Sequence, residues 1–404
     1  MSVDALYVAG RQCFAVSNPS RLPTVERARA TIETSSAGGV DDRAGPRDLV
    51  VEAEGGVLGP AQLTALGAAI GAGKRAWLYW PRERAVETVD RERLRSYRRL
   101  RRVAAVLAPF ARIASHLPRR ARAGDPASPV SAAAAATRIE TGDDYKDAAQ
   151  AQWDENPVGS HYADRSVPRT LDWFHEIETH RYRRYAPWMP AVMEFDRHAG
   201  EDVLEIGGGI GTDLAQFARH GARVTDVDLS GGHLRLAEEN FRLRRLTGRF
   251  IQHDAETLPF PDASFDLVYS HGVLHHTPDT ARLVGEVRRV LRPGGRVIAM
   301  LYAESSWHYW RQQVWRRGLV EGRLRRESMG EILSQSVEIS GNDARPLVKV
   351  YTRDRLRALF AAFQDVVIMQ RQLTSEELPL PLRPLRAIVE RVAGWNLIVK
   401  AVRA

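Results

Sequence analysis

Four residues at a spacing of two stand out near the middle of the chain: Glu205, Gly207, Gly209 and Gly211. They end an apolar run that begins at Val203, and a helical pattern over 212–220 follows at once. This order predicts a strand, a tight loop and a helix. Because glycine has no Cβ, a ligand can approach the loop backbone closely. The free N–H groups of the loop and of the helix N-terminus then face that ligand.

Acidic residues follow the next two predicted strands. The run Val224–Asp228 ends in an acid, and the run Phe250–His253 is followed by Asp254. In open α/β sheets, ligands bind at the carboxyl ends of the strands, and an acid after the second strand accepts hydrogen bonds from ribose hydroxyls. We assign this role to Asp228 rather than to Asp226, taking the two side chains to face opposite sides of the strand.

The glycine spacing argues against a dinucleotide fingerprint. That fingerprint is GxGxxG, and counting from Gly207 places Thr212 where the third glycine should stand. A nicotinamide-dependent oxidoreductase is therefore an alternative that this threonine disfavours.

Four stretches in order resemble class I S-adenosylmethionine-dependent methyltransferases of the small-molecule type, with a methyltransferase-11-like domain. They read LEIGGGIGTD, VTDVDLS, QHDAETLPFPDASFDLVYSHGVLHH and VLRPGGRVI. From first to last they span roughly Asp202 to Met300, about a quarter of the chain. The resemblance implies an α/β fold with a Rossmann-like seven-stranded sheet, mostly parallel, whose last strand is antiparallel. It also implies S-adenosyl-L-methionine as the cofactor.

The resemblance further implies roles for the residues around the glycine loop. Glu205 steadies the loop or meets the cofactor's amino group. The three glycines let the backbone approach the amino-acid and ribose parts of the cofactor. Asp228 takes the ribose hydroxyls, and Leu229 packs on the adenine.

Other implied contacts come from later strands and from the segment before the first strand. Asp254 accepts from the adenine amino group, with Ala255 alongside it. Ser270 ends the fourth strand, whose carboxyl end should face the sulfonium. Arg181 and Tyr182 are expected to reach the methionine carboxylate, and a surface arginine with a packed tyrosine is the alternative.

Two histidines after the fourth strand can handle protons. A neutral histidine suits the removal of a proton from an oxygen or nitrogen acceptor near neutral pH. Members of the family carry a similar Leu-His-His there, and its first histidine often helps to seat the cofactor. We expect His275 to line the pocket and consider it the candidate general base. A metal site made of His271, His275, His276 and Asp279 is an alternative whose spacing suits no common site.

Length and composition limit the number of domains and the kinds of protein that the chain can be. A chain of 404 residues with 44 % apolar content allows two or three globular domains. No run of about 18 apolar residues predicts a membrane-spanning helix, and the N-terminus does not resemble a signal peptide. The single cysteine, Cys13, cannot form an internal disulfide. These features favour a cytoplasmic protein, and a peripheral membrane location is kept open.

Composition divides the chain into three parts. We expect an N-terminal region over 1–124, a linker over 125–142 and a methyltransferase domain over 143–404. The N-terminal region should have a weakly ordered start up to about residue 46, then a small α/β piece and a basic helix. The domain should consist of a helical cap, a cofactor-binding core, an insertion over the pocket mouth and C-terminal helices and strands, over 143–199, 200–302, 303–350 and 351–404.

The net charge of +8 is concentrated in the stretch Arg95–Arg122, which holds nine arginines and no acid. Such a stretch permits contact with a membrane surface, an acidic partner or nucleic acid, and a solvated helix face is the alternative. Nucleic acid is not favoured, because Phe110 is the one aromatic residue between Arg98 and Arg122.

The interpretation that we favour is a methyltransferase that acts on a small-molecule or glycan-like acceptor, at oxygen. The oxidoreductase and a non-catalytic scaffold of the same fold are the alternatives. A scaffold would not need the intact glycines and Asp228.

Overall fold

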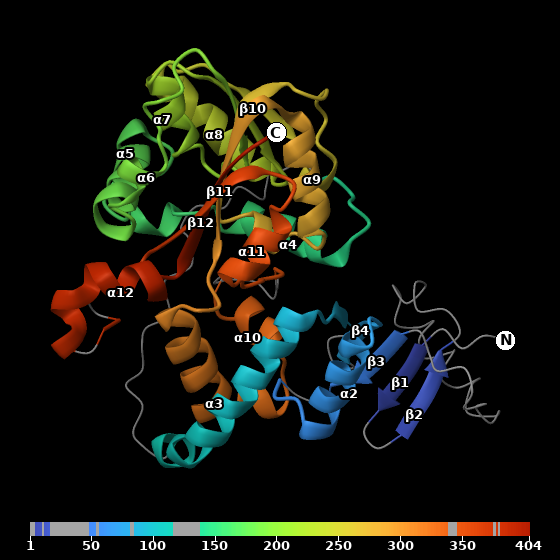
Figure 1. Cartoon of the computed structure of the whole chain (residues 1–404). Helices are drawn as coiled ribbons and strands as arrows, with labels where there is room; N and C mark the ends of the chain where they lie inside the picture. Colours follow the sequence, from blue (N-terminus) through green and yellow to red (C-terminus); the bar gives the residue numbers. More distant parts are fainter. Residues whose placement is uncertain are drawn as a thin grey trace. The chain divides into compact units, whose positions relative to one another are not determined.

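The computed structural model describes residues 5–9, 12–16, 48–53, 56–80, 85–115, 138–337, 346–374, 377–378 and 380–404. The chain forms two compact units. One comprises Met1–Arg119 with Arg311–Ile332, and the other comprises Arg120–Trp310 with Leu333–Ala404. Figure 1 colours both along the chain. Most of the predicted linker over 125–142 lies outside the described residues.

The second unit is built on a seven-stranded sheet in the order β11-β12-β10-β9-β6-β7-β8. Its strands are β6 (Asp202–Ile206), β7 (Arg223–Asp228), β8 (Arg249–Gln252), β9 (Phe265–His271), β10 (Leu291–Tyr302), β11 (Gln364–Arg371) and β12 (Asn396–Val402). β12 runs antiparallel to β10 and β11, and the remaining neighbours are parallel. The predicted fold class, with its antiparallel last strand, is therefore confirmed.

Apolar residues on both faces of the sheet bury it between two layers of helices (Figure 1). Leu204 and Ile206 of β6 pack in the layer of α9 (Thr280–Val290) and α11 (Arg353–Leu359). Val203 points the other way, because successive strand residues alternate between faces. It packs with side chains of α6 (Met189–Val192), α7 (Leu214–Arg219) and α8 (Gly231–Arg244).

The strand order reverses between β6 and β9. The chain runs outward from β6 through β7 to β8 and then returns to place β9 on the other side of β6. In open α/β sheets the crevice at this reversal, at the carboxyl ends of the strands, is where ligands bind. The loops after β6, β7, β8 and β9 are therefore the place to look for a site.

Helices precede the sheet and follow its edge. Over 143–199, where we predicted a helical cap, lie α4 (Asp144–Glu155), η3 (Ser160–Tyr162), α5 (Leu171–His180), the π-helical η4 (Arg181–Tyr185) and α6. Short 3-10 turns follow the edge strand β8, the central strand β9 and the edge strand β11: η5 (Ala255–Thr257), η6 (Leu274–His276) and η9 (Leu380–Leu385). The helix α12 (Arg386–Ala393) then leads into β12.

The first unit has a sheet of its own, in the order β2-β1-β3-β4-β5. Its elements are β1 (Ala5–Ala9), β2 (Gln12–Val16), β3 (Asp48–Glu52), α2 (Pro60–Gly71), β4 (Arg75–Trp80), β5 (Ala85–Thr88) and α3 (Arg91–Ser115). Leu66 of α2, Leu78 of β4 and Leu94 of α3 share one apolar core. The predicted α/β piece and the helix after it are present.

Two segments of the start that we expected to be weakly ordered form strands, and most of the rest, 17–47, lies outside the described residues. β1 pairs with β2 and, in parallel, with β3. The composition of this region, dominated by the polar stretch after residue 16, does not indicate these two strands of five residues each. These strands are stabilised by pairing with a distant strand, a contact that local composition does not reveal.

The centre of the predicted insertion over 303–350 also differs from expectation. Residues Arg311–Ile332 group with the N-terminal unit rather than with the domain to which we assigned them. They include most of η7 (Tyr309–Val320), the turn η8 (Arg323–Arg325) and the start of α10 (Met329–Ser334). The Gly56 N–H donates to the Glu327 carbonyl at 3.0 Å, which joins this segment to the residues after β3.

The predicted basic stretch forms α3 as far as Ser115, and its remainder to Arg122 lies outside the described residues. Val106 and Phe110 on this helix are exposed. Within the ranges given above, the structure contains no helix with the length and apolarity needed to cross a bilayer.

Candidate functional site

The glycine loop after β6 adopts the backbone conformation that its composition predicts. Gly207, Gly209 and Gly211 all have positive φ, at 72°, 57° and 73°. A Cβ at Gly207 would lie 2.3 Å from the Val273 side chain, and one at Gly209 would lie 2.5 Å from Val158. Other residues are strained in this conformation and would also collide here, so these positions require glycine.

Two carboxylates of β7 hold the loop. The Gly208 N–H donates to Asp226 Oδ1 at 3.0 Å, and the Gly209 N–H donates to Asp228 Oδ2 at 3.2 Å. Our expectation that Asp226 faces away from Asp228 was therefore wrong. Residues two apart in a strand point to the same side, so both acids meet the loop.

Asp228 is buried, and two further groups donate to it. The Ser230 N–H donates to Oδ1 at 2.8 Å, and His233 Nδ1 lies 3.1 Å from Oδ2. His233 Nε2 accepts the Val158 N–H at 3.3 Å, so the ring proton is on Nδ1 and points to Asp228. A carboxylate offers about four acceptor positions, so room remains for one ribose hydroxyl beside these donors.

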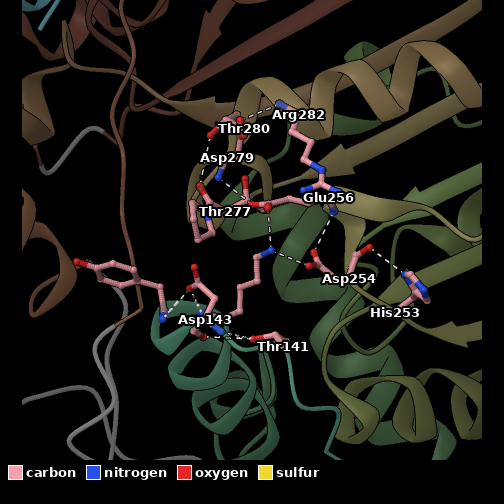
Figure 2. Close-up of polar contacts among 12 residues, drawn as sticks. Thr141, Asp143, His253, Asp254, Glu256, Thr277, Asp279, Thr280 and Arg282 are labelled. Carbon is pink, nitrogen blue, oxygen red and sulfur yellow. Dashed lines mark hydrogen bonds and ion pairs between the residues drawn. The ribbon is translucent and has the colours of Figure 1, made fainter. Parts of the chain in front are cut away.

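Asp254, the predicted adenine acid, lies in the loop after β8 (Figure 2). Its Oδ1 accepts the Glu256 N–H at 2.9 Å, and its Oδ2 accepts from Lys146 Nζ at 2.6 Å. Ala255 packs at the edge of the core beside it. Leu229 is half-buried, and its carbonyl accepts from Gln252 at 3.0 Å. The loops after β7 and β8 thus place Leu229, Asp254 and Ala255 at the same edge of the sheet.

Glu205 and Asp226 are buried acids that each keep one carboxylate oxygen without a partner among the described residues. Burial raises the pKa of Glu205 well above its usual range, and Asp213 and Asp226 add to this rise. Burial and the neighbouring Asp228 likewise raise the pKa of Asp226. A cationic amine that donates to these oxygens would offset both costs. The residues around the loop therefore fit the amino group of S-adenosylmethionine.

Arg181 and Tyr182 converge on Asp213, at the start of α7. Arg181 donates through Nε to Oδ1 at 2.6 Å and through Nη2 to Oδ2 at 2.5 Å. The hydroxyls of Tyr182 and Tyr269 donate to the same carboxylate at 2.5 and 2.8 Å. Arg181 thus reaches the loop region, where its contact is with Asp213, and its predicted contact with the methionine carboxylate stays a prediction. Sequence reasoning missed Asp213, although it is the last residue of the quoted stretch LEIGGGIGTD, two residues after Gly211.

We expect Arg181→Met to make the protein sensitive to acid. Burial alone would raise the pKa of Asp213, but Arg181 and the tyrosine hydroxyl lower it from 3.8 to about 2. Because this pKa is depressed, Asp213 stabilises the fold above about pH 4, and that contribution is lost as the pH falls toward 2. Without Arg181 the loss should begin at higher pH. At pH 7 the free energy of unfolding should fall by about 1–2 kcal/mol, since two hydroxyl donors remain.

Urea unfolding of both proteins between pH 7 and pH 3 measures this effect. Arg165→Met is the matched control, because Arg165 is exposed and its pair with Glu176 should contribute little. Equal acid sensitivity of Arg181→Met and Arg165→Met would contradict the role given to the Asp213 cluster.

Ser270 and His271 lie at the end of β9, and His275 and His276 lie in the turn η6 that follows it. The Ser270 hydroxyl donates to the Ile206 carbonyl at 2.9 Å, which ties β9 to β6. His275 is fully buried, and neither of its ring nitrogens has a partner in the described part of the chain. Its ring lies 3.9 Å from that of Tyr302 and 4.2 Å from that of His276.

The imidazoles of His271 and His275 are neutral near pH 7, because the pKa of each is lowered. Burial lowers the pKa of His275 well below its usual value, and the neighbouring His276 and His271 lower it further. Burial and then Arg181 lower the pKa of His271 to about 3, and its Nε2 has no partner among the described residues. His276 Nδ1 instead lies 2.7 Å from the Leu347 carbonyl and must donate to it. His271 and His275 therefore carry free nitrogen acceptors at the carboxyl end of β9.

Sequence reasoning also missed the contacts of the segment 143–160. Lys146 binds Asp254, and Asp154 Oδ1 accepts from Ser230 Oγ at 2.6 Å and from the Gly232 N–H at 2.9 Å. We expected this segment as part of a helical cap, but spacing along the chain does not show which later loops it meets. Nowhere in the described ranges do three or more His, Cys, Asp or Glu side chains form a group that would hold a metal ion.

Comparison with known proteins bears on the central stretch. Residues 204–299 match the family described as "Methyltransferase domain". A demethylmenaquinone methyltransferase of Tropheryma whipplei is 38 % identical over 101 residues, which are 25 % of this chain and 41 % of that protein. The 27-O-demethylrifamycin SV methyltransferase of Amycolatopsis mediterranei is 33 % identical over 158 residues, which are 38 % of this chain and 54 % of that protein.

A crystal structure of a SAM dependent methyltransferase from Aquifex aeolicus is 13 % identical and has a TM-score of 0.36, covering 58 % of this chain and 98 % of that one. The chain spans about half the length of the two relatives named above. The predicted resemblance is thus confirmed for the stretch from Leu204 to Ala299, which matches that family.

Proposed function

We propose that this chain is an S-adenosylmethionine-dependent methyltransferase that acts on a small-molecule acceptor. The observation that carries the proposal is the grouping of left-handed glycines, Asp228, Asp254 and the unpartnered Glu205 oxygen at the reversal of strand order. The two relatives have names that refer to a demethylmenaquinone and to a demethylrifamycin. Those names support a small molecule as the acceptor.

The roles of the residues follow from their chemistry. S-Adenosylmethionine supplies a methyl group already activated on a sulfonium, so the protein must mainly orient donor and acceptor. The positive-φ glycines leave space against the loop backbone, and Glu205 with Asp226 offers buried acceptors to an amine. Asp228 presents a charged acceptor to the ribose, and Asp254 presents one to the adenine amino group. Charge-assisted hydrogen bonds of this kind are the stronger class.

Oxygen is the acceptor atom that we propose. A hydroxyl acceptor must lose a proton, and His275 is the residue that we assign to take it. The lowered pKa of His275 supports a neutral ring at pH 7, and its unpartnered nitrogens support a free acceptor. A neutral imidazole is suited to general-base catalysis.

A panel of acceptors tests the proposed function. The purified protein would be incubated with S-adenosylmethionine and matched pairs of small molecules, each with a free hydroxyl or with that hydroxyl blocked as an ether. We expect S-adenosylhomocysteine to form with at least one hydroxyl compound and not with its ether. His275→Ala should lower kcat about 100-fold or more while leaving cofactor affinity unchanged. Turnover with an amine or carbon acceptor alone would refute the oxygen assignment.

Two narrower proposals concern other partners. A glycan-like acceptor remains a case to include in the panel. Contact of the basic helix α3 with an anionic membrane surface is supported by the exposed Val106 and Phe110 among its arginines. Co-sedimentation with acidic vesicles at low and high salt checks this contact, and no binding at low salt would remove it.

A further inference from the structure

Lys146 joins the helix α4 to the loop after β8 through two acids. Its amine donates to Asp254 Oδ2 at 2.6 Å and to Glu256 Oε2 at 2.7 Å. Only 12 % of the Lys146 side chain is exposed, and that of Glu256 is buried as well. Figure 2 shows Asp254 and Glu256 directed toward this shared amine. The pair is therefore largely shielded from solvent, unlike the surface ion pairs that contribute little.

Hydrogen bonds at the N-terminus of α4 fix the position of Lys146 in its helix. Asp143 caps α4 and accepts the N–H groups of Tyr145 and Lys146 at 2.9 and 3.1 Å. The Thr141 hydroxyl donates to Asp147 at 2.8 Å and fixes the chain that enters the helix. Lys146 thus lies in the first helical turn, where the helix dipole favours acids rather than a cation. The two carboxylates compensate for this unfavourable position.

The amine remains charged in this setting. Burial alone would lower the pKa of Lys146, but the hydrogen bonds to Asp254 and Glu256 raise it above its usual value. Glu256 is also fixed from the opposite side, since its Oε1 accepts the Asp279 N–H at 2.8 Å at the start of α9. Lys146 therefore connects a cap helix, the loop after β8 and, through Glu256, the helix that follows β9.

The rest of the segment follows the same edge of the sheet. Asp154, at the other end of α4, binds Ser230 and Gly232 at the start of α8. The Val158 N–H then donates to His233, whose ring holds Asp228. One continuous segment thus contacts the loop after β8, the loop after β7 and the glycine loop, in that order. Its first contact is the one made by Lys146.

We propose that Lys146 is a positioning residue that orients Asp254 for recognition of the adenine amino group, an inference that rests on the proposed function. Lys146 occupies Oδ2 of Asp254, and the Glu256 N–H occupies Oδ1, so the carboxylate plane is fixed at both oxygens. Each oxygen keeps a second acceptor position. An adenine amino group can donate to such a position, whereas the carbonyl of hypoxanthine at the same place would be repelled.

Calorimetric titration with two ligands tests this role. The ligands are S-adenosylhomocysteine and its hypoxanthine counterpart, S-inosylhomocysteine. In the wild-type protein the adenine ligand should bind more tightly. Lys146→Met should weaken binding of the adenine ligand by about tenfold or more, as for the loss of a bond to a charged group, and should reduce the affinity ratio of the two ligands by a similar factor. Lys146→Arg should retain most of the discrimination, because a guanidinium can bridge both acids.

Two further variants separate positioning from stability. Lys400→Met removes another partly buried lysine, paired with Glu194 away from the loop after β8, and should leave the affinity ratio unchanged. Glu256→Gln keeps the charge of Lys146 but weakens its second contact, so it should reduce the affinity ratio of the two ligands by a smaller factor. This variant also tests the proposal if Lys146→Met does not fold.

The outcomes distinguish the two proposals. If the wild-type protein binds neither ligand, the proposed function fails and this inference fails with it. If the wild-type protein binds the adenine ligand but Lys146→Met and Glu256→Gln keep the wild-type ratio, only the role of Lys146 is refuted. A lower Tm at an unchanged ratio would mark Lys146 as a structural ion pair.

Discussion

Asp228→Ala should weaken the binding of S-adenosylmethionine by about 1.5–3 kcal/mol, the range for a hydrogen bond to a charged group. The substitution removes the acceptor proposed for the ribose. It also frees the Gly209 N–H, the Ser230 N–H and His233, which all donate to this carboxylate in the structure. The loss of affinity should therefore lie toward the upper end of that range. Calorimetric titration with S-adenosylmethionine measures it.

Asp226→Ala is the matched control when the ligand is 5′-methylthioadenosine, which keeps the ribose and lacks the amine that we propose for Asp226. Asp226 is the neighbouring buried acid of β7, and it accepts the Gly208 N–H as Asp228 accepts that of Gly209. With this ligand both variants remove one anchor of the loop, and only Asp228→Ala also removes a proposed ligand contact. If both variants lose the same affinity for 5′-methylthioadenosine, the effect belongs to the loop and the ribose assignment is wrong.

Gly207→Ala should both destabilise the protein and remove measurable cofactor binding. Gly207 has a φ of 72°, and a left-handed conformation costs other residues roughly 1–2 kcal/mol. The new Cβ would also lie 2.3 Å from Cγ2 and 2.9 Å from Cγ1 of Val273, so the whole valine must move. Overpacking of this kind costs about a further 1–3 kcal/mol. Thermal unfolding and titration with S-adenosylmethionine measure the two effects.

Gly200→Ala is the control that separates the cost of the left-handed backbone from the cost of the steric collision. Gly200 has a φ of 77°, and a Cβ there meets nothing within 4 Å. This control should therefore show only the cost of the backbone conformation and keep its cofactor affinity. The account requires Gly207→Ala to be clearly the less stable of the two, and equal stability would contradict the steric argument.

Much of the second unit could be predicted from local patterns. Three short runs lie next to a glycine or an acid, and the structure contains strands there. The first is followed by Gly207, the second ends in Asp228, and the third is followed, after His253, by Asp254. Parallel strands buried on both faces carry such continuous apolar runs. The glycine loop could be predicted in detail, because positive φ values restrict residue type more strongly than most structural features do.

Contacts between distant segments could not be predicted in the same way. β1 and β2 depend on pairing with β3, and the segment Arg311–Ile332 groups with residues more than 190 positions earlier in the sequence. Lys146 and Asp254 lie 108 residues apart in the sequence and meet in the folded chain. A lysine in a charged helix has no local signal that separates a solvated side chain from one that binds two buried acids.

The side-chain directions at the site show a different limit. We assigned Asp226 to the wrong side of its strand because we misapplied the alternation of side chains. Residues two apart, such as Asp226 and Asp228, lie on the same face. His275, in contrast, was expected in the pocket region, and the structure places it at the carboxyl end of β9 with both ring nitrogens unpartnered among the described residues. Its chemical role depends on an acceptor that neither pattern nor burial identifies.

The most direct test of the central claim is a parallel calorimetric titration of the purified protein with S-adenosylmethionine, S-adenosylhomocysteine and NADH. The account predicts that the first two ligands bind at the glycine loop and that NADH does not. Binding of NADH alone would contradict the account and restore the oxidoreductase alternative. Binding of none of the three would also contradict it and would favour the non-catalytic scaffold.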